Sequence, residues 1–326
     1  MIKTKKTYLK LREIVFGFLF LLPSVLWAGG PGTTGAVELK IPVAPEAIAM
    51  GGAFVAVAND ANSVYWNPAG LLQLHGIHIT TQYSAFLNTL KYEYLAIGSP
   101  LGNNNDYAVG LATKILSSGE VPAVDANGNP TGGYVGENYM DVDLAGAIRL
   151  NYWLNLGLTA KYISKNLSGV SASTFAIDLG LLYFTPIPHL RAGLDIQNLG
   201  PGLKFETVSD PLPIIIRTGV AYKLFNDNFT TSFELDFPSD NKPAVSVGGE
   251  YWYMNTLVGR FGYQYQGAID VNELGIGALS GLYLGMGVKF RAFGSYFGFD
   301  YSWSDAGFLG NTALGQINNF ALNAYL

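Results

Sequence analysis

The chain has 326 residues, of which 13% are charged, 49% are hydrophobic and 13% are aromatic, and its formal net charge is −5. This charged fraction is about half that of an ordinary globular protein, which argues against a wholly water-exposed surface and favours one that faces lipid. Cysteine is absent and no basic block follows the first dozen residues, which excludes thiolate chemistry and argues against nucleic-acid binding.

The N-terminus has the pattern of a secretory signal peptide. Five basic side chains lie within residues 3–12, an apolar run covers residues 14–27, and Ala28, Gly29 and Gly30 offer a cleavage site. The alternative is a membrane anchor, but the apolar run is shorter than the roughly 20 residues that a spanning helix needs. We therefore expect residues 1–30 to be a signal peptide that directs Sec export.

The next segment, residues 31–72, is expected to be a plug inside a barrel. It is rich in glycine and proline, and Pro45–Met50 is predicted to form a short helix, because proline suits the first helical position. Gly51 and Gly52 follow at the point where the helix should end.

Alternating apolar and polar residues dominate the remainder, residues 73–326. In the segment Phe297–Trp303, one face is wholly aromatic and the other carries Gly298, Asp300 and Ser302, as expected for a strand with two different surroundings. We predict about fourteen strands, an even number that suits a single-chain outer-membrane barrel. They lie near 75–86, 91–98, 106–116, 139–150, 153–164, 173–184, 189–197, 212–224, 229–237, 244–253, 256–266, 281–291, 295–303 and 317–326.

The predicted connections fall into two classes by length, which supports an all-β transmembrane antiparallel barrel. Outer-membrane barrels have short periplasmic turns and longer outer loops. Most of the long connections lie on one side, at 117–138, 165–172, 198–211, 267–280 and 304–316. A soluble antiparallel barrel or sandwich would show the same alternation. Its architecture does not require long loops on one side and short turns on the other.

Charged residues on the inward face of the predicted strands are expected to form a polar network in the lumen, because a charge in lipid is costly. They are Asp141, Asp143, Arg149, Lys161, Asp178, Arg191, Asp195, Arg217, Glu234, Glu250, Arg260, Lys289, Arg291 and Asp300. The network could conduct ions or brace the plug against the wall. Both signs occur in similar number, which favours bracing, since a selective pore shows one dominant sign.

Other side chains lack the pattern of an active site. Aromatic residues near the predicted strand ends are typical of interfacial belts, namely Tyr152, Trp153, Trp252, Tyr253, Tyr301 and Trp303. His75 and His78 are three apart on a predicted strand and should face opposite sides, which makes a poor metal pair. The sequence predicts no enzyme activity, no metal site and no cofactor.

Three ordered blocks carry a family resemblance. The first is Ala49–Leu71, which contains Trp66-Asn67-Pro68-Ala69, the second extends from Gln197 to Tyr222, and the third lies between Gly259 and Gly310. Together they resemble the PorV/PorQ family, which belongs with FadL-type outer-membrane proteins, and Asn67-Pro68-Ala69 is similar to the NPA motif of the FadL plug. The chain departs from the pattern where it ends in Leu326, because such strands usually end in an aromatic residue.

The resemblance implies two functions, both non-enzymatic and both in the bacterial outer membrane after signal-peptide removal. One is an accessory or shuttle role in type IX-like protein secretion, with secretion-machine or exported proteins bound at the outer loops. The alternative is a FadL-like channel for small hydrophobic compounds. The plug motif, Trp66, Asn67, Pro68 and Ala69, would then either gate the lumen or close the barrel floor.

Overall fold

The computed structural model describes residues 30, 32–86, 90–102, 104–125, 127–266, 281–305 and 316–326. Residues 1–29 of the expected signal peptide, the predicted loop 267–280 and most of the predicted loop 304–316 lie outside the described residues. Among the described residues, no helix is both long enough and apolar enough to cross a membrane.

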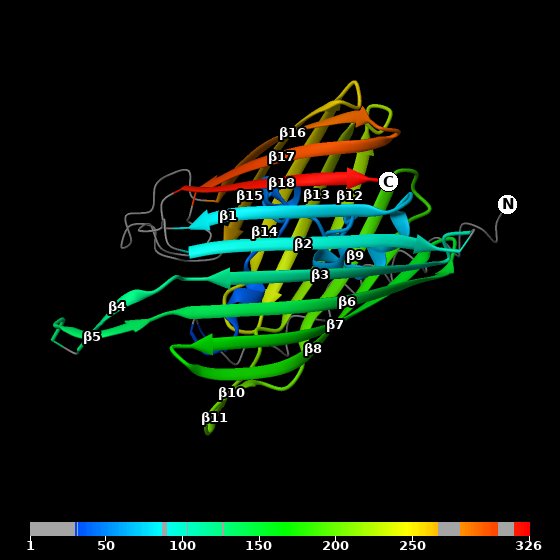
Figure 1. Cartoon of the computed structure of the whole chain (residues 1–326). Helices are drawn as coiled ribbons and strands as arrows, with labels where there is room; N and C mark the ends of the chain where they lie inside the picture. Colours follow the sequence, from blue (N-terminus) through cyan, green and yellow to red (C-terminus); the bar gives the residue numbers. More distant parts are fainter. Residues whose placement is uncertain are drawn as a thin grey trace.

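Fourteen antiparallel strands form one closed barrel, as predicted (Figure 1). Successive barrel strands pair with each other, and β1 and β18 close the ring with register from His78↔Tyr325 to Ala85↔Asn318. The barrel strands are β1 (His78–Phe86), β2 (Leu90–Leu101), β3 (Tyr107–Ser117), β6 (Glu137–Asn151), β7 (Leu154–Leu167), β8 (Val170–Phe184), β9 (Leu190–Leu199), β12 (Ile215–Leu224), β13 (Phe229–Pro238), β14 (Ala244–Tyr253), β15 (Leu257–Gln266), β16 (Leu282–Ala292), β17 (Ser295–Asp305) and β18 (Gln316–Tyr325).

The wall is apolar outside and small or polar inside. In β3, the outward side chains of Tyr107, Val109 and Leu111 are 55%, 40% and 48% exposed. The alternate positions Ala112 and Lys114 are buried. This period of two follows from the pleat of a strand, which sends successive side chains to opposite faces.

The two ends of the barrel differ. At one end, the predicted outer loops 117–138 and 198–211 contain two further hairpins, β4 (Val121–Val124) with β5 (Pro130–Val135) and β10 (Leu203–Phe205) with β11 (Val208–Asp210). The predicted long loop 165–172 is wrong, because β7 and β8 pair as far as Leu167 and Val170 and leave only a two-residue turn, 168–169. The β4–β5 hairpin extends away from the barrel (Figure 1). At the other end, five hairpins of the barrel have the short turns 152–153, 185–189, 225–228, 254–256 and 293–294, close to the predicted positions.

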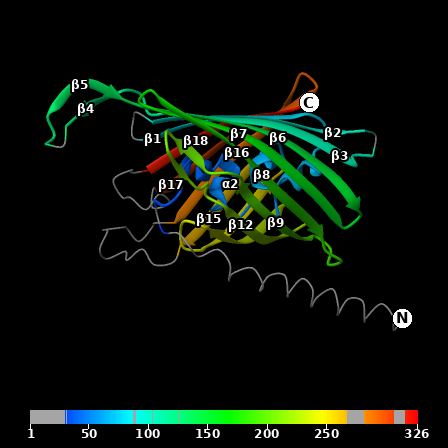
Figure 2. The same ribbon diagram turned by 90° about the horizontal axis from the view of Figure 1, so that it is seen from below.

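The N-terminal segment, residues 32–74, lies within the ring of strands (Figure 2). It contains η1 (Val37–Lys40), α2 (Pro45–Ala49), α3 (Ser63–Trp66) and η2 (Pro68–Gln73). The predicted short helix is therefore present, and Gly51 and Gly52 follow it with φ of 68° and 80°. Most of the segment's apolar side chains are buried and form one cluster with inward residues of the wall.

Candidate functional site

The Trp66–Ala69 motif is fully enclosed. Asn67 donates hydrogen bonds from its amide to the carbonyl oxygens of Val55 (2.8 Å) and Leu181 (3.0 Å). Its Oδ1 accepts from the backbone N–H of Ala69 at 3.2 Å and so begins η2. Trp66 donates from Nε1 to the carbonyl oxygen of Val43 at 3.0 Å. The motif thus joins distant parts of the N-terminal segment to each other and to β8.

Pairs of glycines on the inner wall make room for the N-terminal segment. We call these pairs the glycine sockets; each consists of two residues that face each other across neighbouring strands. They are Gly98 with Gly110, Gly157 with Gly180, Gly193 with Gly219 and Gly248 with Gly262. The Gly157–Gly180 socket holds Asn67, Pro68 and Ala69. The Gly98–Gly110 socket holds Leu71, Val64 and Leu74. The Gly193–Gly219 socket holds Val55 and Ala56, and the Gly248–Gly262 socket holds Met50 and Gly51.

The sockets depend on the absence of side chains. A Cβ added at Gly157 would lie well under 3.0 Å from backbone atoms of Pro68 and Ala69. Glycine is favoured where another backbone approaches this closely. The segment therefore contacts the wall directly, and the four sockets come from eight strands around the barrel.

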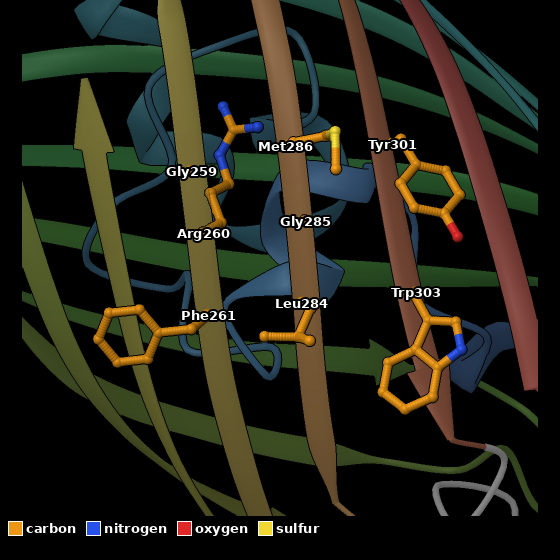
Figure 3. A pocket seen from close by; sticks show the side chains of 8 residues that line it. All are labelled: Gly259, Arg260, Phe261, Leu284, Gly285, Met286, Tyr301 and Trp303. Atoms are coloured by element: carbon orange, nitrogen blue, oxygen red, sulfur yellow. The ribbon is translucent and has the colours of Figure 1, made fainter. Parts of the chain in front are cut away.

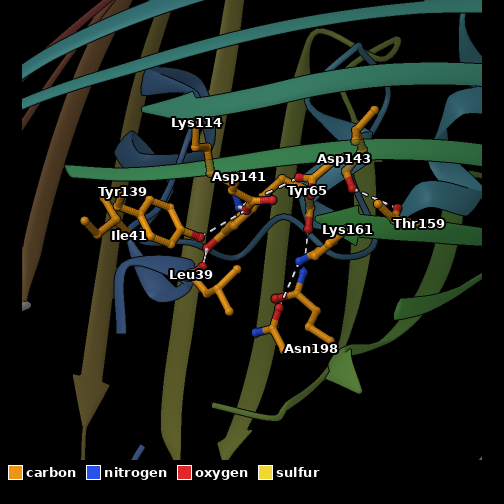
Figure 4. A network of polar contacts seen from close by, with 12 residues as sticks. Leu39, Ile41, Tyr65, Lys114, Tyr139, Asp141, Asp143, Thr159, Lys161 and Asn198 are labelled. Atoms are coloured by element: carbon orange, nitrogen blue, oxygen red, sulfur yellow. Dashed lines mark hydrogen bonds and ion pairs between the residues drawn. The ribbon is translucent and has the colours of Figure 1, made fainter. Parts of the chain in front are cut away.

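One cluster of buried charges links β3, β6, β7 and β8 (Figure 4). Lys114 lies 2.5 Å from Asp141 and 3.8 Å from Asp143, and all three side chains are fully buried. Lys161 lies 2.7 Å from Asp178 and donates to Asn198 at 2.9 Å. Tyr65 of the N-terminal segment packs its ring 4.9 Å from the Lys114 ammonium.

A second cluster fixes α3 and the chain before it. The guanidinium of Arg217 lies 4.7 Å from the Trp66 ring and donates to the Tyr65 hydroxyl at 3.5 Å. Asp195 is the cross-strand partner of Arg217 and is also buried. Glu234 accepts from the backbone N–H of Val55 at 2.7 Å.

A third cluster surrounds Arg260 and includes α2. The Arg260 guanidinium contacts Glu250 (2.7 Å) and Asp300 (2.5 Å) on the wall and Glu46 (3.5 Å) of α2. The Arg260 side chain is 1% exposed. A buried guanidinium needs such partners, because an unpaired charge is costly to desolvate.

Four predicted network residues lie apart from these clusters, and one of them, Arg291, is exposed with its guanidinium 5.7 Å from the Tyr296 ring. Arg191 is buried but bonds to Gln73 of the N-terminal segment instead of to an acid. Arg149 is a correction, because its side chain is 35% exposed and lies 3.9 Å from Asp106 at the short-turn end. Lys289 is partly exposed, with its ammonium 3.9 Å from the Tyr325 ring.

Trp252 is a second correction. It was expected in an interfacial belt, but its ring lies 5.8 Å from the Arg260 guanidinium and it shares the inward phase of Glu250. Arg260 thus contacts an aromatic ring as well as its carboxylates, which suits a planar guanidinium.

The sequence reasoning missed six charged residues that hold the N-terminal segment in place, one of which is Glu46 beside Arg260. Lys114 shares a face with Ala108, Gly110 and Ala112, so alternation was a sufficient signal for it. The others required knowledge of which parts of the chain meet. Lys40 pairs with Asp240 at 2.6 Å, and Lys165 pairs with Glu38 at 2.7 Å.

Two acids of the N-terminal segment have raised pKa values. Burial raises the pKa of Asp60 to about 7, although two hydrogen bonds from Asn62 favour its charged form. Burial also raises the pKa of Glu38; nearby Glu137 acts in the same direction and Lys165 in the opposite one.

An apolar hollow of about 430 Å³ lies on the wall where β15, β16 and β17 meet (Figure 3). Phe261, Leu284, Met286 and Trp303 are among its lining residues. Gly285 forms part of its base, and a Cβ there would clash with Ala49 of α2. The N-terminal segment therefore lies directly behind the hollow. Among the described residues, no group of three or more His, Asp or Glu side chains could hold a metal ion.

The structure defines a closed, fourteen-stranded antiparallel barrel with a folded segment inside it, and several solved structures have a similar overall fold. The toluene transporter TbuX of Ralstonia pickettii matches with a TM-score of 0.58 and 16% identity, over 86% of this chain and 96% of its own. The toluene transporter TodX of Pseudomonas putida matches with a TM-score of 0.56 and 14% identity, over 93% and 98%.

A FadL homologue of Pseudomonas aeruginosa has a TM-score of 0.55 and 12% identity, over 92% of this chain and 98% of its own. At such identities the similarity establishes a common fold. No family model matches the sequence, and no curated protein matches it.

Proposed function

We propose that this protein is a FadL-like channel of the bacterial outer membrane, closed by its N-terminal segment, that admits small hydrophobic compounds. The observation that carries the proposal is the combination of an apolar outer wall with a lumen occupied by a folded segment. The same overall fold occurs in two proteins described as toluene transporters. Residues 1–30 would be the signal peptide, residues 31–72 the plug and residues 73–326 the barrel.

The outer wall supports the membrane location. Leu144, Phe175 and Leu322 are 61%, 64% and 62% exposed on the outward face. Large apolar patches of this kind are rare on soluble monomers but normal on a surface in contact with lipid. Outer-membrane lipid is thus the first partner of the chain, and most charged side chains of the barrel strands face inward; Lys91 and Glu93 on β2 are exposed.

The inner charges support the bracing role of the polar network. In the described lumen, many acids and bases pair with each other or with the N-terminal segment, as Arg260 does with Glu46 and Asp300. A compound that passes through would therefore require the segment to shift, which makes Trp66, Asn67, Pro68 and Ala69 part of a movable plug. The glycine sockets limit that shift to a displacement of the segment away from the wall.

The comparisons favour the channel over the secretion hypothesis, because similar solved structures are described as a toluene transporter and a monoaromatic hydrocarbon channel. An accessory role in secretion stays a prediction that rests on the PorV/PorQ resemblance. A pull-down from detergent-solubilised outer membranes separates the two, since only the secretion hypothesis requires recovery of secretion components or exported proteins.

Uptake of labelled toluene by intact Gram-negative cells tests the channel. Cells that carry the chain in the outer membrane are compared with cells that carry an empty vector. Arabinose serves as a hydrophilic control solute. We expect faster toluene uptake and unchanged arabinose uptake. Equal toluene uptake in both strains would argue against the channel, and faster arabinose uptake would indicate an open aqueous pore instead.

A further inference from the structure

The short turns of the barrel present apolar side chains at their tips. Phe225, Met254 and Phe293 are 73%, 76% and 101% exposed, and the Phe225 ring lies 6.3 Å from the ring of Phe229. Tyr152 and Ile187, in two other turns, are 91% and 56% exposed. Water-exposed turns are ordinarily made of Gly, Asn, Asp, Ser and Pro, which suit the backbone.

Backbone conformation makes the choice of residue more unusual. Phe225, Met254 and Phe293 have φ of 53°, 53° and 51°, in the left-handed region that large L side chains rarely adopt. Glycine and asparagine are preferred there, and the chain does use Asn255 and Gly294 at the following positions. Turn geometry therefore does not explain the three apolar residues.

These turns occupy consecutive positions around the rim. The hairpins β6–β7, β8–β9, β12–β13, β14–β15 and β16–β17 follow one another in the barrel, and each has an exposed apolar residue in its turn. We call these five turns the apolar rim. The turn between β2 and β3 has no such apolar residue among its described positions, Gly102, Asn104, Asn105 and Asp106, whereas the apolar rim also carries the exposed His189 and Asp227, whose side chains lie 2.8 Å apart.

The apolar rim continues directly into the outer wall. Tyr251 and Tyr253 on the outward face of β14 are 48% and 53% exposed, and Met254 follows at once. On β16, Phe290 is 51% exposed and lies three residues before Phe293. Along these hairpins, no charged outward side chain separates wall from tip. Aromatic residues are enriched where a membrane protein meets the headgroup region.

We propose that the apolar rim inserts into the interface of the lipid leaflet at the short-turn end, so that the turns lie in the membrane and not in water. The inference rests on the proposed membrane location of the barrel wall. A lipid surface fits better than a protein partner, because the apolar surface of the rim is continuous with that of the wall. The rim would then fix how deep the barrel sits.

Site-directed spin labelling tests the depth directly. The chain has no cysteine, so Phe225→Cys, Met254→Cys and Phe293→Cys each give one labelled site. The purified full chain is reconstituted in phosphatidylethanolamine–phosphatidylglycerol vesicles. Accessibility to oxygen, which enters lipid, is compared with accessibility to a water-soluble nickel complex. Leu144→Cys on the wall is the lipid reference, and Asp125→Cys on the β4–β5 hairpin is the water reference.

We expect the three tips to be several-fold less accessible to nickel than Asp125→Cys, and to lie between the two references in oxygen accessibility. Tips as accessible to nickel as Asp125→Cys, with Leu144→Cys in lipid, would overturn the inference alone. A nickel-accessible Leu144→Cys would instead overturn the membrane location. Tips that are exposed in vesicles but protected in native outer membranes would indicate a protein partner and overturn the lipid proposal.

Discussion

Replacing Gly157 with alanine should loosen the N-terminal segment without changing any charge. The new Cβ would lie well under 3.0 Å from the backbone of Pro68 and Ala69, and backbone atoms cannot rotate away as a flexible side chain can. Inserting one carbon into a packed site costs about 1–3 kcal/mol. Because the obstructing atoms are backbone, we expect the upper part of this range.

The affected equilibrium is the release of the segment from its socket. A cost of about 3 kcal/mol raises the released fraction by roughly two orders of magnitude. Limited trypsin digestion of the folded barrel reports this fraction through cleavage after Lys40, since proteolysis follows the population of the open state when reclosing is fast. The matched control is Gly146→Ala, where an added Cβ meets nothing within 4 Å.

We expect cleavage after Lys40 to be much faster in Gly157→Ala than in the wild type, with Gly146→Ala unchanged. Heat-dependent migration on SDS gels checks that both variants form barrels. Equal cleavage rates in all three proteins would refute the idea that direct backbone contact with the wall holds the segment.

Three further predictions concern the charges and the mobility of the segment. Arg260→Met leaves Glu46, Glu250 and Asp300 without their shared cation, so the free energy of unfolding in urea should fall by about 3–5 kcal/mol. Arg149→Met removes an exposed pair and should cost about 1 kcal/mol or less. A loss for Arg260→Met no larger than that for Arg149→Met would contradict the buried network. The raised pKa of Asp60 means that the folded state binds more protons than the unfolded state between about pH 4 and 7, so stability should fall as pH rises through this range, by at most about 4 kcal/mol. In Asp60→Asn this dependence should flatten, and an unchanged pH profile would show that Asp60 is not responsible. Finally, a Cβ at Gly35 would lie 3.5 Å from that of Leu203, which is within the range of a disulfide bond. In the double variant Gly35→Cys/Leu203→Cys, toluene uptake should fall on oxidation and return on reduction. Toluene uptake that is the same in the oxidised and reduced protein would argue against a moving segment.

The strands were predictable because their signal is local. In β17, aromatic residues alternate with Gly298, Asp300 and Ser302. This pattern can be read from neighbouring residues without knowing which strands pair. The hairpin β4–β5 was hidden in a predicted loop. Pro122 and the glycines after Pro130 interrupt alternation there, and both residue types weaken a strand pattern.

The site was less accessible to sequence reasoning because it depends on register. Asp141, Asp178 and Arg217 could be assigned to the inside from their phase alone. Gly157 faces Gly180 only because β7 pairs with β8 in this register. The place of Asn67 against this socket therefore cannot be read from the sequence alone. Trp252 was assigned to the wrong side because a tryptophan near a strand end was weighed by residue type, when its phase with Glu250 pointed inward.

The glycine sockets also have a consequence for the order of assembly. Each socket exists only when two neighbouring strands are in register, and the four together need strands from β2 to β15. The residues that fill them precede β1 in the chain, while the ring closes only when β1 meets β18. The N-terminal segment therefore has to be in place before β1 pairs with β18. Otherwise it would have to enter a barrel that is already closed. A chain of such high contact order should fold slowly, and closure around the segment would be its final, committing step.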